Sequence, residues 1–313
     1  MLKIKLNTKN IYFVMYHYVR EKKKKNSVLN FLEISEFKRQ ISFFKKNANI
    51  LNNEDLNEIL ITKKTQKKPV VILTFDDGYY DHYKYVFPIL KKNKISGFFY
   101  PPINVIENSK ILDVNKIHFI LAKENHSKIL KLIFSYLKND FEISQKDLIK
   151  LKNLKIKNRY DDRETGLIKI LLQNYLPFNQ RTKILSKIFK KLFGNNESYL
   201  SNKTYLSKKN ILEMSDNSMS FGSHGYNHHW WETLSISDQE YELKKSINFY
   251  KKNNLYKKPF SVAYPYGSYN QNSIKLLKKY KVSFALTTKP GSVNLRNIKN
   301  NFIFPRYDTN DFK

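Results

Sequence analysis

Short apolar runs alternate with segments of helical spacing near both ends of the sequence, and this alternation restricts the possible fold more than any other feature. Runs rich in β-branched and aromatic residues predict buried strands at 11–17, 70–75, 96–100, 218–223, 260–263, 282–287 and 302–304. Helical spacing is found at 35–46, 83–92 and 272–280, and a capping-box pattern at 237–240 predicts the start of a further helix. Strands that alternate with helices in this order favour parallel βα units.

The alternation is interrupted in the middle of the chain. From 105 to 206 the sequence has only helical periodicity and polar joints. A stretch of about one hundred residues is too long for a loop and too regularly patterned for a disordered segment. We therefore predict a βα part formed by residues 1–104 and 207–313, and an inserted, all-helical subdomain formed by residues 105–206.

The composition limits the classes of function. The net charge of +30 comes mainly from lysines spread along the whole sequence, and no helix-turn-helix, zinc-finger or RNP-like pattern accompanies them, so we expect no nucleic-acid partner. The absence of cysteine excludes disulfides and thiolate metal ligands. No apolar stretch is long enough to span a membrane and the run at 11–16 does not resemble a signal peptide, so we expect a cytoplasmic location.

Two segments that each follow a predicted strand carry residues suited to metal-dependent hydrolysis. The segment TFDDG ends the apolar run that begins at residue 70, and the segment GSHGYNH follows the strand predicted from residue 218. Adjacent side chains on a strand diverge, so Asp76 and Asp77 divide naturally into one metal ligand and one general base. His224 and His228 are four residues apart and can converge on one divalent ion if the segment coils. In a βα barrel the carboxyl ends of the strands meet on one face, so we expect these side chains to meet there.

Three segments in this order, 74–78, 223–228 and 263–267, resemble the sequence motifs of the polysaccharide deacetylase family, carbohydrate esterase family four. The resemblance extends over 10–104 and 207–308 and leaves the helical insertion outside it. The dipeptide Tyr16-His17 is similar to the start of one subgroup of the family. The resemblance implies a distorted (β/α) barrel and an enzyme that removes acetyl groups from N-acetylated sugars.

The resemblance also implies a role for each matching residue. Asp76 would be the general base, and Asp77, His224 and His228 would bind one divalent metal ion, most often zinc. The backbone N–H of Tyr266 would face the oxyanion. We expect substrate contacts from the third motif and from a nearby tryptophan, that is, from Tyr264, Pro265, Tyr266, Gly267 and Trp230.

The chain departs from the family pattern in three places. The third motif usually begins with an arginine that orients the base, where this chain has Ala263; we expect Arg306 to supply the charge instead, with a surface ion pair as the alternative. The residue after the first metal-binding histidine is usually Ser or Thr, and here it is Gly225. No histidine follows His229, so the histidine that usually protonates the leaving amine is absent from its usual place. His17, at the end of the first predicted strand, is our candidate replacement, and a core histidine is the alternative.

One segment of the insertion, 181–194, has an apolar stripe with lysines mostly beside it. Such a basic amphipathic helix suits peripheral contact with an anionic membrane, and the alternative is that the stripe packs against the barrel.

The sequence therefore predicts a zinc-dependent or similar N-deacetylase that acts on an N-acetylated sugar, oligosaccharide or lipid-linked sugar in surface polysaccharide or glycolipid biosynthesis. The cytoplasm, or the inner face of the membrane, is the expected location. A deformylase or another amide hydrolase on the same fold is one alternative. A degenerate member that binds glycan without turnover is the other.

Overall fold

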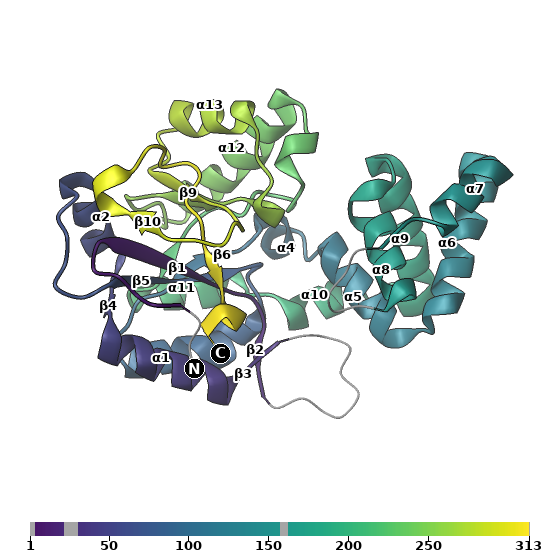
Figure 1. Cartoon of the computed structure of the whole chain (residues 1–313). Helices are drawn as coiled ribbons and strands as arrows, with labels where there is room; N and C mark the ends of the chain where they lie inside the picture. The colour runs from purple at the N-terminus through teal and green to yellow at the C-terminus, as the bar shows by residue number, and fades with distance from the viewer. Residues whose placement is uncertain (1–3, 22–30, 157–161, 313) are drawn as a thin grey trace. The chain divides into compact units, whose positions relative to one another are not determined.

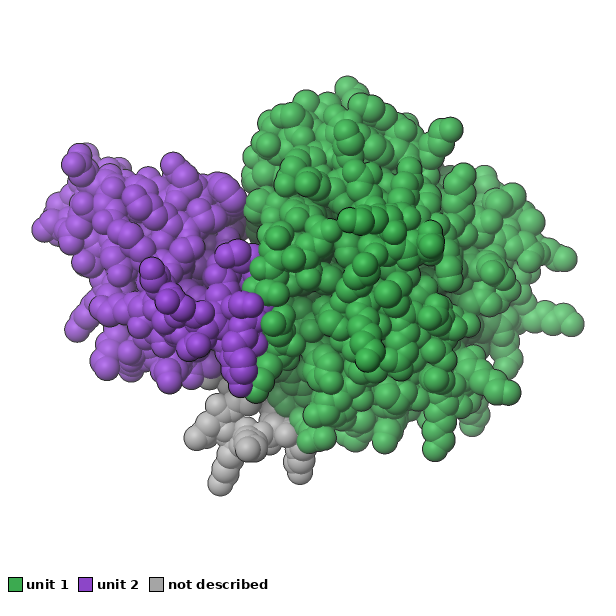
Figure 2. All heavy atoms as spheres, turned by 180° about the vertical axis from the view of Figure 1, so that it is seen from behind, with its two compact units in different colours: residues 1–23, 31–109, 202–313 green, residues 24–30, 110–201 purple. Residues whose placement is uncertain are grey.

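The chain folds into two compact units, which Figure 2 colours separately. The computed structural model describes residues 4–21, 31–156 and 162–312. Within these ranges, the residues up to Ser109 together with those from Asn202 onward form the first unit, and those from Lys110 to Ser201 form the second.

The first unit is built on a ring of parallel strands (Figure 1). Four strands pair side by side in the order β1 (Asn10–Tyr16), β5 (Val70–Asp76), β6 (Phe98–Tyr100) and β7 (Ser220–Phe221). A single bridge between Ser223 and Val262 joins them to the parallel pair β8 (Ser261–Ala263) and β9 (Phe284–Leu286). A bridge between Leu286 and Phe304, and the pairing of β11 (Tyr307–Asp308) with β1, close the ring. The predicted distorted (β/α) barrel is thus confirmed. At two places in the ring, neighbouring segments are joined by a single bridge and not by a full ladder.

The prediction of a strand at 302–304 is wrong. Only Phe304 pairs with a neighbour there, and the strand that completes the ring is the short β11 further along the chain. A run of three apolar or aromatic residues satisfies the local strand pattern, but a ladder also needs a partner along its length.

Shorter strands add to the ring at its amino-terminal end. β10 (Val293–Asn294) pairs antiparallel with the first two residues of β1, and β4 (Asn49–Ile50) pairs with the first two residues of β5. β2 (Val19–Arg20) and β3 (Leu32–Glu33) form a separate parallel pair.

The alternation of side chains along the strands divides the core of this unit into two clusters. Ile11 and Phe13 of β1 belong to one cluster with Val70 and Ile72 of β5, whereas Tyr12, Val14 and Tyr16 belong to the other. Three aromatic rings pack together here, with centroids no more than 5.9 Å apart: those of Phe13 in β1, Phe284 in β9 and Phe304 in the bridge to Leu286. Thr74 and Asp76 continue the row of Val70 and Ile72 along β5, so the first aspartate faces the same way as this cluster.

Helices cover the ring. They are α1 (Ile34–Asn47), α2 (Asn53–Thr62), α3 (Phe87–Lys92), α4 (Ile103–Glu107), α11 (Lys208–Asp216), α12 (Ile236–Lys252) and α13 (Gln271–Lys279). A π-helical turn, η1 (His82–Val86), precedes α3, and short 3-10 turns occur at η3 (Trp231–Thr233), η4 (Pro265–Gly267), η5 (Leu295–Asn297) and η6 (Thr309–Phe312). As predicted, α1 buries the stripe of Phe37, Ile41 and Phe44.

The residue that caps α12 lies two positions before the predicted one. The helix is capped by Ser235, whose side chain accepts a hydrogen bond from the backbone N–H of Asp238. The predicted capping box at 237–240 is not used. Both serines are chemically competent caps, so the sequence pattern alone did not distinguish them.

The described part of the second unit contains helices and no strand. They are α5 (Asp113–Lys123), α6 (His126–Phe141), α7 (Gln145–Lys152), α8 (Arg163–Ile170), the π-helical η2 (Leu171–Tyr175), α9 (Phe178–Phe193) and α10 (Glu197–Thr204), which extends past the unit boundary. Ile184, Leu185 and Ile188 of α9 are buried where α9 contacts α5 and α6. These residues of the apolar stripe thus pack inside the insertion itself.

No helix in the described ranges is both long enough and apolar enough to cross a bilayer.

Candidate active site

A sharp turn after β5 separates the two adjacent aspartates. Asp76 is the last residue of the strand, and Asp77 and Gly78 both adopt left-handed backbone angles, with φ of 68° and 65°. A Cβ on Gly78 would lie 2.5 Å from Cβ of Pro101, so a side chain has no room there. A left-handed aspartate is uncommon and is found mainly where surrounding structure imposes it. The turn therefore directs the carboxyl groups of Asp76 and Asp77 to different partners.

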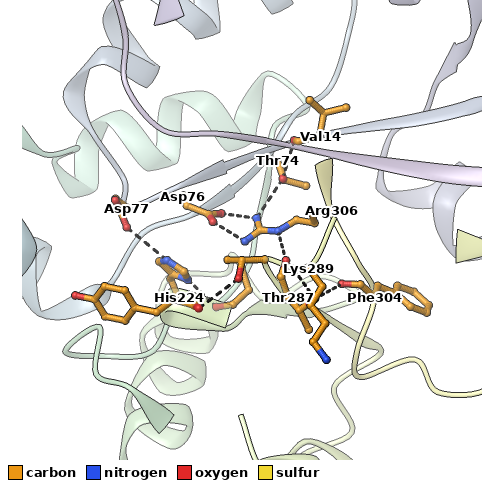
Figure 3. Close-up of polar contacts among 12 residues, drawn as sticks. Val14, Thr74, Asp76, Asp77, His224, Thr287, Lys289, Phe304 and Arg306 are labelled. Atoms are coloured by element: carbon orange, nitrogen blue, oxygen red, sulfur yellow. Dashed lines mark hydrogen bonds and ion pairs between the residues drawn. The ribbon is translucent and has the colours of Figure 1, made fainter. Parts of the chain in front are cut away.

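Asp77 meets both histidines of the second motif. Its Oδ1 lies 3.4 Å from Nε2 of His224 and 3.2 Å from Nε2 of His228, and all three side chains are buried. The hydroxyl of Tyr79 donates to the other carboxylate oxygen, Oδ2, at 2.7 Å. Nδ1–H of His224 donates to the carbonyl oxygen of Ala263 at 2.6 Å, so in the neutral ring the lone pair is on Nε2, which faces Asp77 (Figure 3).

This donor set fits a divalent metal ion. The candidate ligand atoms lie within 4.8 Å of one another. Oδ1 of Asp77 is buried and makes no hydrogen bond within the described part of the chain, whereas Oδ2 of the same carboxylate accepts the bond from Tyr79. One carboxylate oxygen and two imidazole nitrogens suit zinc, iron or cobalt. Burial opposes ionisation of Asp77, but the imidazoles of His224 and His228 beside it together outweigh burial and hold the pKa of this carboxyl well below its usual range.

Asp76 forms a buried ion pair with Arg306. Nη1 and Nη2 of the guanidinium donate to the two carboxylate oxygens at 2.8 and 2.7 Å, and Arg306 is fully buried (Figure 3). Nε of Arg306 donates to the carbonyl oxygen of Thr287 at 2.9 Å, and Nη1 also reaches Oγ1 of Thr74 at 3.3 Å. Burial would raise the pKa of Asp76, but the charge and hydrogen bonds of Arg306, together with the nearby His224 and His17, outweigh burial and lower it. The alternative of a surface ion pair for Arg306 does not describe this buried, bidentate geometry.

His17 lies where β1 ends, beside the two aspartates. It is half-buried, and its charged form would interact favourably with both Asp76 and Asp77. Its carbonyl oxygen accepts a hydrogen bond from Nε2–H of His82 at 2.7 Å. The structure therefore brings His17 to the carboxylate cluster from a separate strand.

The third motif contributes one aromatic face next to the histidines. The ring of Tyr266 stacks on Trp230, with centroids 4.3 Å apart and an interplanar angle of 7°, and lies 4.6 Å from the ring of His228. Tyr266 has a left-handed φ of 58°. Tyr264 is fully buried between Trp231 and Tyr269, so its side chain is a packing element. Pro265 is buried, whereas Tyr266, Gly267 and Trp230 are partly exposed.

Two residues near the candidate ligands escaped the sequence analysis. Tyr79 bonds Asp77, and its only signal is its position one residue after the TFDDG segment. Glu242 of α12 is buried and bonds the backbone between the two histidines. Its signal is a polar stripe on the buried face of α12, where Gln239, Glu242 and Ser246 recur at helical spacing.

Comparisons with known proteins concern the family and the fold of the chain. The family model described as polysaccharide deacetylase matches residues 63–128 and 179–285. No curated protein sequence matches the chain. The Streptococcus pyogenes deacetylase PplD, solved in complex with acetate, has a similar structure, with 18% identity over 96% of this chain and 92% of that chain and a TM-score of 0.60.

Two further solved structures share the fold. IcaB from Ammonifex degensii has 14% identity over 95% of this chain and 90% of that chain, with a TM-score of 0.56. A de-N-acetylase from Aggregatibacter actinomycetemcomitans has 15% identity over 96% of this chain and 95% of that chain, with a TM-score of 0.55. At such low identity these likenesses establish the architecture of the barrel.

Proposed function

The chain belongs to the polysaccharide deacetylase family, whose members hydrolyse N-acetyl amide bonds in sugars, and from this premise we propose that it is an N-deacetylase that needs one divalent metal ion. The observation that carries the proposal is the buried Oδ1 of Asp77, which lacks a hydrogen-bond partner among the described residues and faces two imidazole nitrogens. A buried carboxylate oxygen left in this state costs free energy unless a ligand completes its coordination.

Asp77, His224 and His228 would hold the ion, and zinc is our choice because an oxygen and two nitrogens form a common zinc ligand set. A zinc ion there would supply Lewis-acid chemistry, which polarises the amide carbonyl and lowers the pKa of water. Tyr79 would fix the orientation of the Asp77 carboxylate through its hydrogen bond to Oδ2. The bond from His224 to Ala263 would fix the tautomer of that ring.

Asp76 is the proposed general base. Its pKa is lowered despite burial, so the carboxylate is ionised near neutral pH and able to accept a proton from the attacking water. Each of its oxygens accepts one bond from Arg306 and retains a second lone pair. Arg306 would hold the carboxylate in place, which is the role that the family assigns to the arginine replaced here by Ala263.

His17 is the proposed donor of the proton that the leaving amine requires. It is half-buried, comes from the end of β1, and interacts electrostatically with Asp76 and Asp77. The backbone N–H of Tyr266 is the proposed donor to the developing oxyanion.

The proposed substrate is an N-acetylated sugar, either an oligosaccharide or a lipid-linked sugar of surface polysaccharide or glycolipid synthesis. The family description and the stacked rings of Trp230 and Tyr266 beside His228 support a sugar ligand, because a sugar ring can pack against an aromatic face.

Acetate release from N-acetylglucosamine oligomers, with and without added zinc, tests this function. Asp76→Asn should keep bound zinc but reduce turnover by about 10²-fold or more, since it removes the base. His228→Ala should lose stoichiometric zinc, whereas His126→Ala, in the second unit, serves as the control that keeps it. A wild-type protein that binds no divalent ion, or an Asp76→Asn variant with full activity, would refute the proposal.

A further inference from the structure

The segment between His224 and His228 has an irregular backbone that needs external support. Gly225 and His228 have left-handed φ angles of 73° and 62°, so the segment is neither helix nor strand. A buried backbone N–H in such a segment must find a partner outside regular secondary structure. The N–H of Gly225 donates to Oγ of Ser223 at 3.1 Å.

The next two N–H groups donate to a single buried side chain, Glu242. Its Oε2 accepts from the backbone N–H groups of Tyr226 and Asn227, each at 2.8 Å, and its Oε1 accepts from Nδ2 of Asn227 at 2.6 Å. Glu242 is 1% exposed and comes from α12, which begins eight residues after the segment. Three hydrogen bonds that this one side chain accepts thus tie the segment to a helix of the barrel.

The position of Glu242 also explains why residue 225 is a glycine. A Cβ at Gly225 would lie 2.9 Å from Oε2 of Glu242, so the carboxyl group occupies space that a side chain at residue 225 would need. On the other side of the segment, Asn104 donates from its backbone N–H to the carbonyl oxygen of Tyr226 at 2.9 Å and from Nδ2 to Oδ1 of Asn227 at 2.7 Å. The segment is therefore held from both sides, and Glu242 bonds its N–H groups.

We propose that Glu242 is a positioning residue that holds the segment 224–228 in the conformation that presents both histidines to the metal ion. The inference rests on the proposed function, because it assumes a metal ion at Asp77, His224 and His228. Without Glu242 the N–H groups of Tyr226 and Asn227 would lose their partner, and the segment would relax to pair them elsewhere. Outer partners that orient metal ligands typically contribute 10–100-fold to metal affinity, and we expect Glu242 to act in this way.

The experiment compares zinc affinities of purified full-length variants by competition with a chelating dye. Glu242→Asp keeps an acid but shortens the side chain by one methylene, so it cannot reach both N–H groups; we expect about 10–100-fold weaker zinc binding. Glu242→Gln keeps the length and one oxygen for the two N–H groups, so its loss should be smaller than that of Glu242→Asp. Leu243→Ala, a buried neighbour on α12, is the matched control: it should lower stability but leave zinc affinity within about threefold.

Visible absorption of bound Co²⁺ gives a second readout, because it depends on ligand geometry. Glu242→Asp should change this spectrum, and Leu243→Ala should not. Asn227→Ala keeps Glu242 but removes one of its three bonds and also the bond that Nδ2 of Asn104 donates. If Glu242→Asp does not fold, Asn227→Ala and Glu242→Gln together decide the question, and about threefold or greater loss of zinc affinity is expected in each.

The outcomes separate the two proposals. A wild-type protein that binds no zinc refutes the proposed function itself. Wild-type zinc binding that is unchanged in the Glu242 and Asn227 variants refutes only the role of Glu242. If Glu242→Asp loses less zinc affinity than Glu242→Gln, the effect comes from the charge of Glu242. If Leu243→Ala loses as much zinc affinity as Glu242→Asp, the effect comes from general stability. Either result would refute the proposal that Glu242 positions the segment.

Discussion

Acidification should destabilise the protein through His82. This side chain is fully buried; Nε2–H donates to the carbonyl oxygen of His17, and Nδ1 makes no hydrogen bond to any described residue. Burial lowers the pKa of His82 from 6.5 to about 4. Between these values the unfolded chain binds a proton that the folded protein excludes, so the free energy of unfolding falls as the pH falls through this window.

The size of the effect follows from the two pKa values. At about 1.4 kcal/mol per pKa unit, a change from 6.5 to about 4 corresponds to about 3 kcal/mol once both states are protonated. About 2 kcal/mol of this is lost between pH 7 and pH 5, because the unfolded imidazole is mostly protonated at pH 5 while the folded one is mostly neutral.

Urea unfolding of wild type and His82→Gln, followed by the fluorescence of Trp230 and Trp231, measures this loss. The glutamine amide can replace Nε2–H as donor to His17 but does not titrate. A chelator keeps both proteins metal-free, so that pH-dependent metal binding does not contribute. The unfolding free energy of wild type relative to His82→Gln should fall by about 2 kcal/mol from pH 7 to pH 5. Val86→Ala, a buried neighbour in η1, should differ from wild type by a constant amount; parallel pH profiles of wild type and His82→Gln would refute the reasoning.

Three further outcomes are expected. Arg306→Met should lower the free energy of unfolding by about 3–5 kcal/mol, because it leaves the buried carboxylate of Asp76 unpaired, and adding Asp76→Asn should recover part of it; additive losses in urea unfolding would contradict this. His17→Ala should lower kcat much more than zinc affinity, and an unchanged kcat and pH–rate profile would make His17 a packing residue. Gly78→Ala should destabilise by about 1–3 kcal/mol, since φ is 65° and the new Cβ would lie 2.5 Å from Pro101; an unchanged urea midpoint would show that the turn relaxes.

Local sequence patterns were sufficient where the chain is locally self-consistent. The continuous apolar run that ends at Asp76 is a fully buried strand, and the spacing of Phe37, Ile41 and Phe44 is the buried face of α1. The patterns were insufficient where the local sequence fits two structures equally well. Either Ser235 or Ser237 could cap α12, and Phe304 could belong to a strand or to one bridge; the folded chain uses Ser235 and a single bridge.

The sequence by itself determined the chemical inventory of this protein and its order along the chain. It contains two adjacent aspartates after a strand, two histidines four residues apart, and a barrel-forming alternation of strands and helices, because these properties depend on residue type and short-range spacing. Only the tertiary structure decided which distant groups pair. Asp76 and Arg306 are 230 positions apart, and they meet because β11 closes the ring beside β1. Glu242 likewise reaches the histidine segment only because α12 packs behind it. Long-range pairs of this kind leave no periodic signal in the sequence, since their geometry is set by closure of the barrel and burial of its helices.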